Sequence, residues 1–213
     1  LQMITLFITN PLKRTLILLP PALIPQWMSA LKRVLNTFTI NYYIKQFTSK
    51  TSAEIKSKLL LDEDPDTHYI IISSYHMIIN RCKYLSRESC FPRLNFKWDR
   101  LILDEIHTIR NHKSKIYATI ENTKAPIRWG MSGTPINNKL GDLKNILSYV
   151  LNYKEDERPL KELINTFILR RIKQKVLAKP LPPCHIQDIS IPFQSQMEKD
   201  IYQIVSDNIL NSI

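Results

Sequence analysis

The stretch from Trp98 to Asn111 reads WDRLILDEIHTIRN and decides the fold. Its centre, Leu101–Leu103, is a run of purely apolar residues, which is typical of a strand buried on both faces of a parallel sheet. Two carboxylates, Asp104 and Glu105, follow that run directly, and His107 comes shortly after them. Because ligands of open α/β sheets bind at the carboxyl ends of the strands, this pattern predicts a site at that edge.

Two adjacent acids at such an edge suit a magnesium–phosphate site. One carboxylate can hold the ion through water, while the other orients or deprotonates the attacking water. The alternative is a strand that ends in solvated acids, since an Asp-Glu-x-His match arises by chance in roughly one in forty chains of this size. Other segments of the chain decide between the two interpretations.

Three further apolar runs also end in small polar or turn residues. They are TLILLPP at Thr15–Pro21, YIIISSY at Tyr69–Tyr75 and IRWGM at Ile127–Met131. The last run predicts another short buried strand, and the tight turn Ser132-Gly133-Thr134-Pro135 follows it. Strands of this kind alternate with segments of helical spacing, which predicts an α/β fold in which helices flank both faces of a parallel β-sheet.

Composition favours a soluble, intracellular protein with a polyanionic partner. The 213 residues carry a formal net charge of +11, although ribosomal proteins and membrane-surface binders are similarly basic. We find no apolar stretch long enough to cross a bilayer, and Leu1–Ile8 lacks the features of a signal peptide. The cysteines Cys82, Cys90 and Cys184 fit no standard zinc spacing and are predicted to be free thiols.

In their order, these segments resemble the Snf-type, helicase-like DNA translocases of superfamily two, which include chromatin remodellers. The resemblance is to the first of that family's two RecA-like lobes. TLILLPPALIPQW looks like motif Ia, YIIISSYHMI like the strand that ends in a hydroxyl-hydroxyl-Tyr turn, and WDRLILDEIHTIRN like the Walker B box. RWGMSGTPINNKLGDL is similar to motif III, and FILRRIKQKVLAKPLPP (Phe167–Pro183) resembles the segment that leaves lobe one.

The resemblance implies ATP and Mg²⁺ as cofactors and assigns roles to residues of this chain. Asp104 would help to hold the magnesium of the nucleotide, and Glu105 would act as base or orienter of the water. His107 and the turn Ser132, Gly133, Thr134 and Pro135 would sense the terminal phosphate. The residues expected to contact double-stranded DNA are Pro20, Pro21, Ser73, Ser74, Tyr75, Arg110, Asn111 and Lys113. For the two serines, the alternative is that their hydroxyls only satisfy the end of a strand.

The chain departs from the family's pattern at its start. Its only glycines are Gly130, Gly133 and Gly141, so a glycine-rich loop ending in Gly-Lys-Thr does not precede motif Ia, and the backbone amides that would wrap the phosphates are lacking. The first residues look like the helix that follows this loop in the family. We therefore expect residues 1–152 to be lobe one, truncated before its first helix. Residues 153–193 would be a helix and a Pro-rich linker, and residues 194–213 an amphipathic helix toward the missing lobe two.

The leading hypothesis is a fragment of an ATP-dependent double-stranded DNA translocase, an ATPase in its full-length form and inactive as the isolated chain. Its partners would be DNA and the second RecA-like lobe, with a nucleosome or a transcription complex as open targets, in the nucleus or in a viral or host DNA compartment. One alternative is a non-catalytic DNA- or protein-binding module derived from such a lobe. Another is an RNA helicase of the Asp-Glu-x-His class, against which the Trp98-Asp99 and Leu181-Pro182-Pro183 boxes argue.

Overall fold

The computed structural model describes residues 2–61, 64–79, 97–123, 125–136, 140–152, 159–171 and 186–210. The chain separates into two compact units, Leu1–Phe167 and Ile168–Ile213. The unit boundary falls directly after the helix that follows Pro159.

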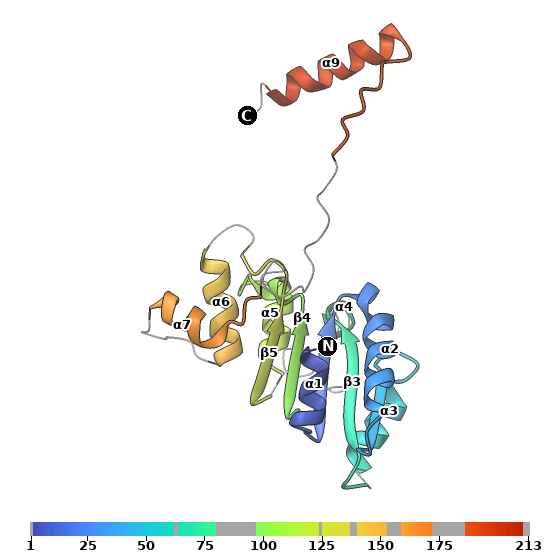
Figure 1. Cartoon of the computed structure of the whole chain (residues 1–213), viewed down its shortest axis with the longest axis vertical. Helices are drawn as coiled ribbons and strands as arrows, with labels where there is room; N and C mark the ends of the chain where they lie inside the picture. Colours follow the sequence, from blue (N-terminus) through green and yellow to red (C-terminus); the bar gives the residue numbers. More distant parts are fainter. Residues whose placement is uncertain are drawn as a thin grey trace. The chain divides into compact units, whose positions relative to one another are not determined.

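The first unit contains a five-stranded sheet in the order β2-β3-β1-β4-β5, and every neighbouring pair is parallel (Figure 1). The strands are β1 (Arg14–Leu19), β2 (Tyr42–Gln46), β3 (His68–Ser74), β4 (Arg100–Asp104) and β5 (Ile127–Met131). The predicted parallel α/β fold is thus confirmed, including a strand that ends at Asp104.

The register of the strands brings their carboxyl ends to one edge of the sheet. Leu18 of β1 lies opposite Ser73 of β3 on one side and opposite Leu103 of β4 on the other. Asp104 in turn lies opposite Met131, the last residue of β5. The segments that follow these four strands therefore emerge as neighbours.

Helices cover both faces of this sheet (Figure 1). They are α1 (Gln2–Thr9), α2 (Ile24–Leu35), α3 (Ser52–Leu61), α4 (Tyr75–Ile79), α5 (Lys115–Glu121) and α6 (Leu140–Leu151). The helix α7 (Leu160–Phe167) also belongs to this unit and lies beside α6 (Figure 1). Two short 3₁₀ turns, η1 (Pro21–Leu23) and η3 (Ile106–Ile109), follow β1 and β4 closely.

Alternating residues of the central strand supply two separate cores. Ile17 and Leu19 of β1 pack with residues of α1 and α2 on one face, whereas Leu16 and Leu18 pack on the other face with residues of α3 to α6. This arrangement explains why β1 is apolar from Leu16 to Leu19, because both faces of this part of the strand are removed from water.

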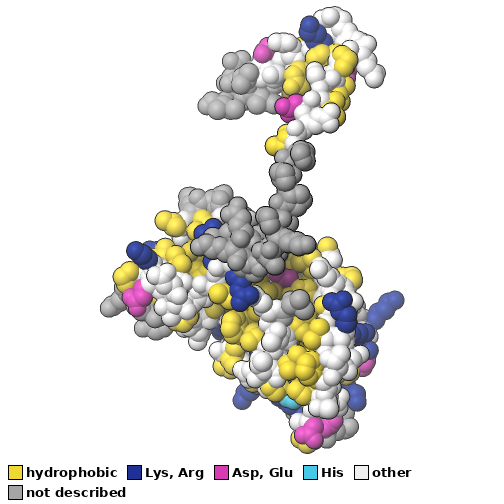
Figure 2. All heavy atoms as spheres, in the orientation of Figure 1, with side chains coloured by type: hydrophobic (Ala, Val, Ile, Leu, Met, Phe, Trp, Pro, Cys, Tyr) yellow, Lys and Arg dark blue, Asp and Glu magenta, His cyan; other side chains and the backbone are white. Residues whose placement is uncertain are grey.

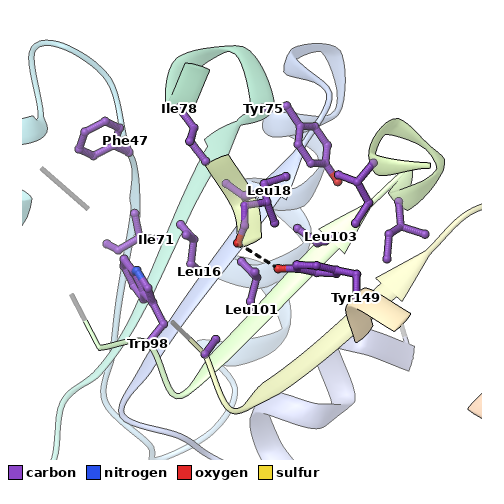
Figure 3. Packing of buried hydrophobic residues seen from close by; sticks show 14 of the residues in the cluster. Leu16, Leu18, Phe47, Ile71, Tyr75, Ile78, Trp98, Leu101, Leu103 and Tyr149 are labelled. Atoms are coloured by element: carbon purple, nitrogen blue, oxygen red, sulfur yellow. Dashed lines mark hydrogen bonds between the residues drawn. The ribbon is translucent and has the colours of Figure 1, made fainter. Parts of the chain in front are cut away.

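Figure 3 shows the second of these cores, in which Leu16, Leu18, Leu101 and Leu103 converge with the aromatic side chain of Tyr149. The Tyr149 hydroxyl donates a hydrogen bond of 3.3 Å to the carbonyl oxygen of Ile120. Each Å² of apolar surface that is removed from water contributes about 25 cal/mol to the free energy of folding. This cluster is therefore a main source of stability for the unit.

The strand β5 differs from its prediction as a buried strand. Its Trp129 is 43% exposed, and none of its five residues is fully buried. The physical reason is its place at the edge of the described sheet, where it pairs with β4. An apolar strand sequence alone does not reveal whether the strand is central or at an edge.

In the second unit the described residues form an extended segment and the helix α9 (Gln196–Leu210). This helix lies within residues 194–213, for which an amphipathic helix toward a second lobe was predicted. Hydrophobic side chains remain exposed along it, and yellow spheres mark them in Figure 2; they include Met197, Ile201, Ile204 and Val205. The predicted Pro-rich linker around Pro180–Pro183 lies outside the described residues. Among the helices described, we find none with the length and apolar character needed to cross a membrane.

Candidate functional site

The backbone turns sharply where the two acids leave β4. Glu105 adopts a left-handed conformation with φ 52° and ψ 52°, which costs a residue with a side chain about 1–2 kcal/mol. The turn that follows offsets this cost, because Ile106 and Ile109 are 3% and 0% exposed within the core. Strained backbone of this kind concentrates at functional sites.

The carboxylate of Asp104 is held by groups from distant parts of the chain. Its Oδ2 accepts a 2.8 Å hydrogen bond from Nε1 of Trp27 in α2, and its Oδ1 accepts one of 3.0 Å from the backbone N–H of Glu105. The hydroxyl of Tyr75, just after β3, donates a 2.7 Å bond to the Asp104 carbonyl oxygen. The end of β4 is thereby fixed in position, while each carboxylate oxygen retains capacity to accept another bond.

Glu105 belongs to a small cluster that joins the ends of β4 and β5. Its Oε2 lies 3.1 Å from Nδ1 of His107, and the same nitrogen lies 3.0 Å from Oγ of Ser132. The Ser132 hydroxyl also reaches Glu105 Oε2 at 3.5 Å, which is the outer limit for a hydrogen bond. The side chains of Glu105 and His107 are 36% and 27% exposed, so water has access to the carboxylate.

The turn after β5 contributes mainly through its serine. Ser132 Oγ accepts a 3.1 Å bond from the backbone N–H of Thr134, which tightens the turn. Gly133 and Thr134 are exposed and Pro135 is partly buried. Of the four residues predicted as phosphate sensors, Ser132 is thus the one that the structure brings to His107.

A close backbone approach fixes the distance between β5 and the acid-bearing turn. A Cβ atom built on Gly130 would lie 2.3 Å from Cδ1 of Ile106 and 3.2 Å from its Cγ2. Since C–C contacts are optimal at about 3.5–4.0 Å, this position accepts only glycine without movement of Ile106. The residue that directly follows Glu105 therefore packs against a glycine of the neighbouring strand.

The residues predicted to contact DNA divide into two groups. The side chains of Ser73, Ser74 and Tyr75 are 0%, 6% and 3% exposed, and the latter two make internal bonds, Ser74 to the backbone N–H of Met77 and Tyr75 to Asp104. This geometry does not support a direct phosphate contact from these three side chains. For Ser74 it favours the alternative, in which the hydroxyl satisfies the end of the strand, whereas the buried hydroxyl of Ser73 has no hydrogen-bond partner among the residues that the structure describes.

The second group lies at the surface. Pro21, Asn111 and Lys113 are exposed, and Pro20 and Arg110 are partly buried. The Asn145 side-chain amide of α6 donates a 2.8 Å bond to the carbonyl oxygen of Arg110, which anchors this loop next to the acid-bearing turn. These residues follow β1 and β4 and so lie at the same edge of the sheet as the acids.

Sequence reasoning missed the bonds that Trp27 and Tyr75 make to Asp104, since it assigned Tyr75 to DNA contact and gave Trp27 no role at the site. In a sequence, Trp27 has the helical spacing of a core residue and Tyr75 that of a strand end, so their bonds become visible only when the sheet brings three distant segments together. Burial, assisted by the nearby carboxylates of Asp104 and Glu105, raises the pKa of Tyr75. Its hydroxyl therefore stays protonated and remains a donor.

The site offers part of a coordination shell for a divalent metal. Among the described residues there is no group of three or more His, Cys, Asp or Glu side chains that could hold an ion. Two carboxylates supply hard oxygen donors, however, and Mg²⁺ binds well to one or two carboxylates when phosphates and waters complete its octahedron. The donor set therefore fits a nucleotide-bound Mg²⁺. The three cysteines predicted to be free thiols lie outside the described residues.

Comparison with known proteins gives one family and a consistent set of relatives. The SNF2-related domain matches residues 3–154. Transcription termination factor 2 of Drosophila melanogaster is 26% identical over 90% of this chain and 19% of its own length. DNA repair protein RAD5B of Arabidopsis thaliana is 27% identical over 88% of this chain and 16% of its own length. A probable global transactivator of Orgyia pseudotsugata multicapsid polyhedrosis virus is 26% identical over 89% of this chain and 38% of its own length.

A solved structure shares the fold. It is the Sulfolobus solfataricus SWI2/SNF2 ATPase core in complex with double-stranded DNA, which superimposes with a TM-score of 0.57 at 24% identity over 84% of this chain and 38% of that one. The chain thus spans well under half the length of these similar proteins.

Proposed function

Because this chain belongs to the SNF2-related domain family, we propose that it forms part of the first RecA-like lobe of an ATP-dependent double-stranded DNA translocase. The cluster of Glu105, His107 and Ser132 beside Asp104 is the observation that carries this proposal. It gathers an acid open to water, a group that can hold metal and a link to the next strand at the edge where α/β sheets bind ligands.

In this proposal each acid has its own role in ATP hydrolysis. When bound, Mg²⁺–ATP supplies the terminal phosphoryl group that water attacks. Asp104 is held firmly by Trp27 and by the Glu105 backbone, which suits a group that must help to fix the metal. Glu105 is partly exposed, which suits a base or orienter of the water.

His107 and Ser132 connect the hydrolysis site with the turn after β5. A change in the charge near Glu105 alters the hydrogen bonds that reach Ser132 Oγ, and the same oxygen accepts the N–H of Thr134. The state of the terminal phosphate is in this way passed to the segment Ser132–Pro135. A switch of this type needs two arrangements of one local element, which a shared serine hydroxyl provides.

For DNA, we propose the exposed residues at the same edge as the track. They are Pro20, Pro21, Arg110, Asn111 and Lys113. The net charge of +11 favours contact with the phosphate backbone, which predicts little sequence preference and strong salt dependence. Names of the relatives, which include a transcription termination factor, a DNA repair protein and a viral transactivator, favour work on DNA in the nucleus or in a viral or host DNA compartment. They leave a nucleosome or a transcription complex as the target, reached together with a second RecA-like lobe.

The decisive experiment compares Glu105→Gln with Glu121→Gln in a longer polypeptide from the same gene. Glu121 is an exposed residue at the end of α5, so it makes the same chemical change away from the site. We expect Glu105→Gln to lower ATP hydrolysis stimulated by duplex DNA by about 10²-fold or more, while Glu121→Gln equals the wild type. The 213-residue chain alone should hydrolyse no measurable ATP.

Three results would contradict the translocase. They are full hydrolysis by Glu105→Gln, a gene with no phosphate-binding loop ahead of α1, and stimulation by RNA in place of duplex DNA. Tight DNA binding by the longer wild-type polypeptide without any hydrolysis would instead establish the non-catalytic binding module.

A further inference from the structure

The indole of Trp27 holds Asp104, and the proposed function gives Trp27 itself no further role. Its Nε1 donates a 2.8 Å hydrogen bond to Asp104 Oδ2 across 77 residues of sequence. The ring is partly buried and packs against the core on the α1 and α2 side of the sheet. The bond thus fastens a helix on one face of the sheet to the carboxylate at its edge.

Such a bond restricts the carboxylate more strongly than an ordinary one. A hydrogen bond to an ionised group is roughly twice as strong as one between neutral groups, and the Trp donor is carried by a bulky ring with little freedom to move. Because Oδ1 is held at the same time by the Glu105 N–H, both oxygens of Asp104 have a fixed donor. The plane of the carboxylate is therefore set before any metal arrives, which reduces the reorganisation that binding requires.

The position of Trp27 along its helix gives this bond a second consequence. Trp27 lies in the first turn of α2, and that helix begins directly after the η1 turn, Pro21–Leu23. The exposed Pro21 of this turn belongs to the proposed DNA track. A displacement of η1 therefore moves the indole, and with it the carboxylate of Asp104.

We infer that Trp27 is a positioning residue for Asp104, whose indole N–H orients the metal-holding carboxylate and links it to the DNA-facing turn ahead of α2. The inference rests on the proposed function for its meaning, but the bond itself can be tested without any activity. Phenylalanine at this position keeps an aromatic ring against the core, removes the donor and packs a smaller surface, so the tests separate loss of the bond from loss of packing.

The first test uses the 213-residue chain and the indole N–H signals in a ¹H–¹⁵N NMR spectrum. The chain has three tryptophans, Trp27, Trp98 and Trp129, and Trp27→Phe identifies the first by its loss. We expect Asp104→Ala to shift that signal and to speed its exchange with water, while the signal of the buried Trp98 stays in place. A Trp27 signal that is unchanged in Asp104→Ala would overturn the inference.

The second test measures DNA-stimulated ATP hydrolysis by the longer polypeptide. Trp27→Phe is compared with Trp129→Phe, which makes the same change on the edge strand β5. We expect kcat to fall about tenfold, equivalent to about 1.4 kcal/mol, and the Mg²⁺ concentration for half-maximal rate to rise, with the KM for ATP unchanged. Mere loss of packing would lower the melting temperature without moving the Mg²⁺ dependence.

The outcomes separate this inference from the function on which it rests. If Trp27→Phe equals Trp129→Phe in kcat and in Mg²⁺ dependence while Glu105→Gln is inactive, the positioning role is wrong and the translocase stands. If Glu105→Gln is also fully active, the proposed function itself fails.

Discussion

Replacement of Gly130 by alanine should disturb the acid-bearing turn by a defined amount. The new Cβ would lie 2.3 Å from Ile106 Cδ1, 3.2 Å from its Cγ2 and 3.3 Å from its Cβ, so the closest pair falls more than about 1 Å short of a normal contact. Ile106 is 3% exposed within the core and has little free space. Overpacking of this kind costs typically 1–3 kcal/mol, from which the lower entropy of the unfolded alanine chain subtracts about 0.4–1 kcal/mol.

We therefore expect Gly130→Ala to lower the free energy of unfolding by about 1–2 kcal/mol. For a unit of this size each kcal/mol shifts the melting temperature by roughly 2–4 °C, and thermal unfolding followed by circular dichroism would detect it. Gly133→Ala is the matched control, because an added Cβ there meets no atom within 4 Å. Its melting temperature should equal or slightly exceed that of the wild type.

A double-mutant cycle locates the cause of the effect. Ile106→Val removes Cδ1, the atom in closest conflict, and by itself should cost about 0.5–1.5 kcal/mol. In the presence of Gly130→Ala, it should cost less or stabilise the protein, since contacting residues couple by about 0.5–3 kcal/mol. Additive effects of the two substitutions, or equal melting temperatures for Gly130→Ala and Gly133→Ala, would refute the reasoning.

Two further predictions concern pH and salt. Burial raises the pKa of Tyr75 and Tyr149, so above pH 10 the unfolded state loses protons that the folded state retains. The free energy of unfolding should therefore be constant with respect to these two groups below about pH 10 and fall as the pH rises further. The absorbance of tyrosinate during alkaline unfolding checks this. Lys113→Ala should weaken binding to duplex DNA of any sequence and reduce the slope of log K against log salt by about 1. The control Lys58→Ala, the same change on α3, should leave this slope unaltered. Fluorescence anisotropy at several salt concentrations measures the slopes, and equal slopes for both variants would show that the proposed track is wrong.

The order of apolar and polar residues along the chain was sufficient to predict individual strands of the sheet. The apolar run Leu101–Leu103 indicated a strand, and the acids after it indicated where the strand ends. A parallel strand that is buried on both faces has a continuous run of apolar residues, so this pattern is easily recognised. The parallel sheet was predicted as well, and the register of its strands places their carboxyl ends at one edge.

Features that depend on the order of strands could not be predicted in the same way. The exposure of Trp129 follows from the edge position of β5, and strand order is a property of the whole sheet. The hydroxyls of Ser73 and Ser74 look alike in a sequence whether they face solvent or the interior, and here both are buried. The bond between Trp27 and Asp104 likewise joins segments that only the completed sheet makes neighbours.

The left-handed backbone of Glu105 is a further feature beyond sequence reasoning. Glycine and asparagine are the usual residues at φ > 0, and a glutamate gives no such indication. The next two apolar residues, Ile106 and Ile109, are buried in the core and hold the turn there, which imposes this conformation on Glu105.

The central position of β1 in the sheet has a consequence for folding during synthesis on the ribosome. Its neighbours β3 and β4 lie far along the chain, and the bond from the Arg14 N–H to Asp99 Oδ2 spans 85 residues. At about 5–20 residues per second, β1 emerges roughly 4–17 seconds before β4 is made. During that interval the sheet is incomplete, so the apolar part of β1 remains exposed on the nascent chain; it consists of Leu16, Ile17, Leu18 and Leu19. Chaperones can bind this exposed segment until translation reaches the acidic pair.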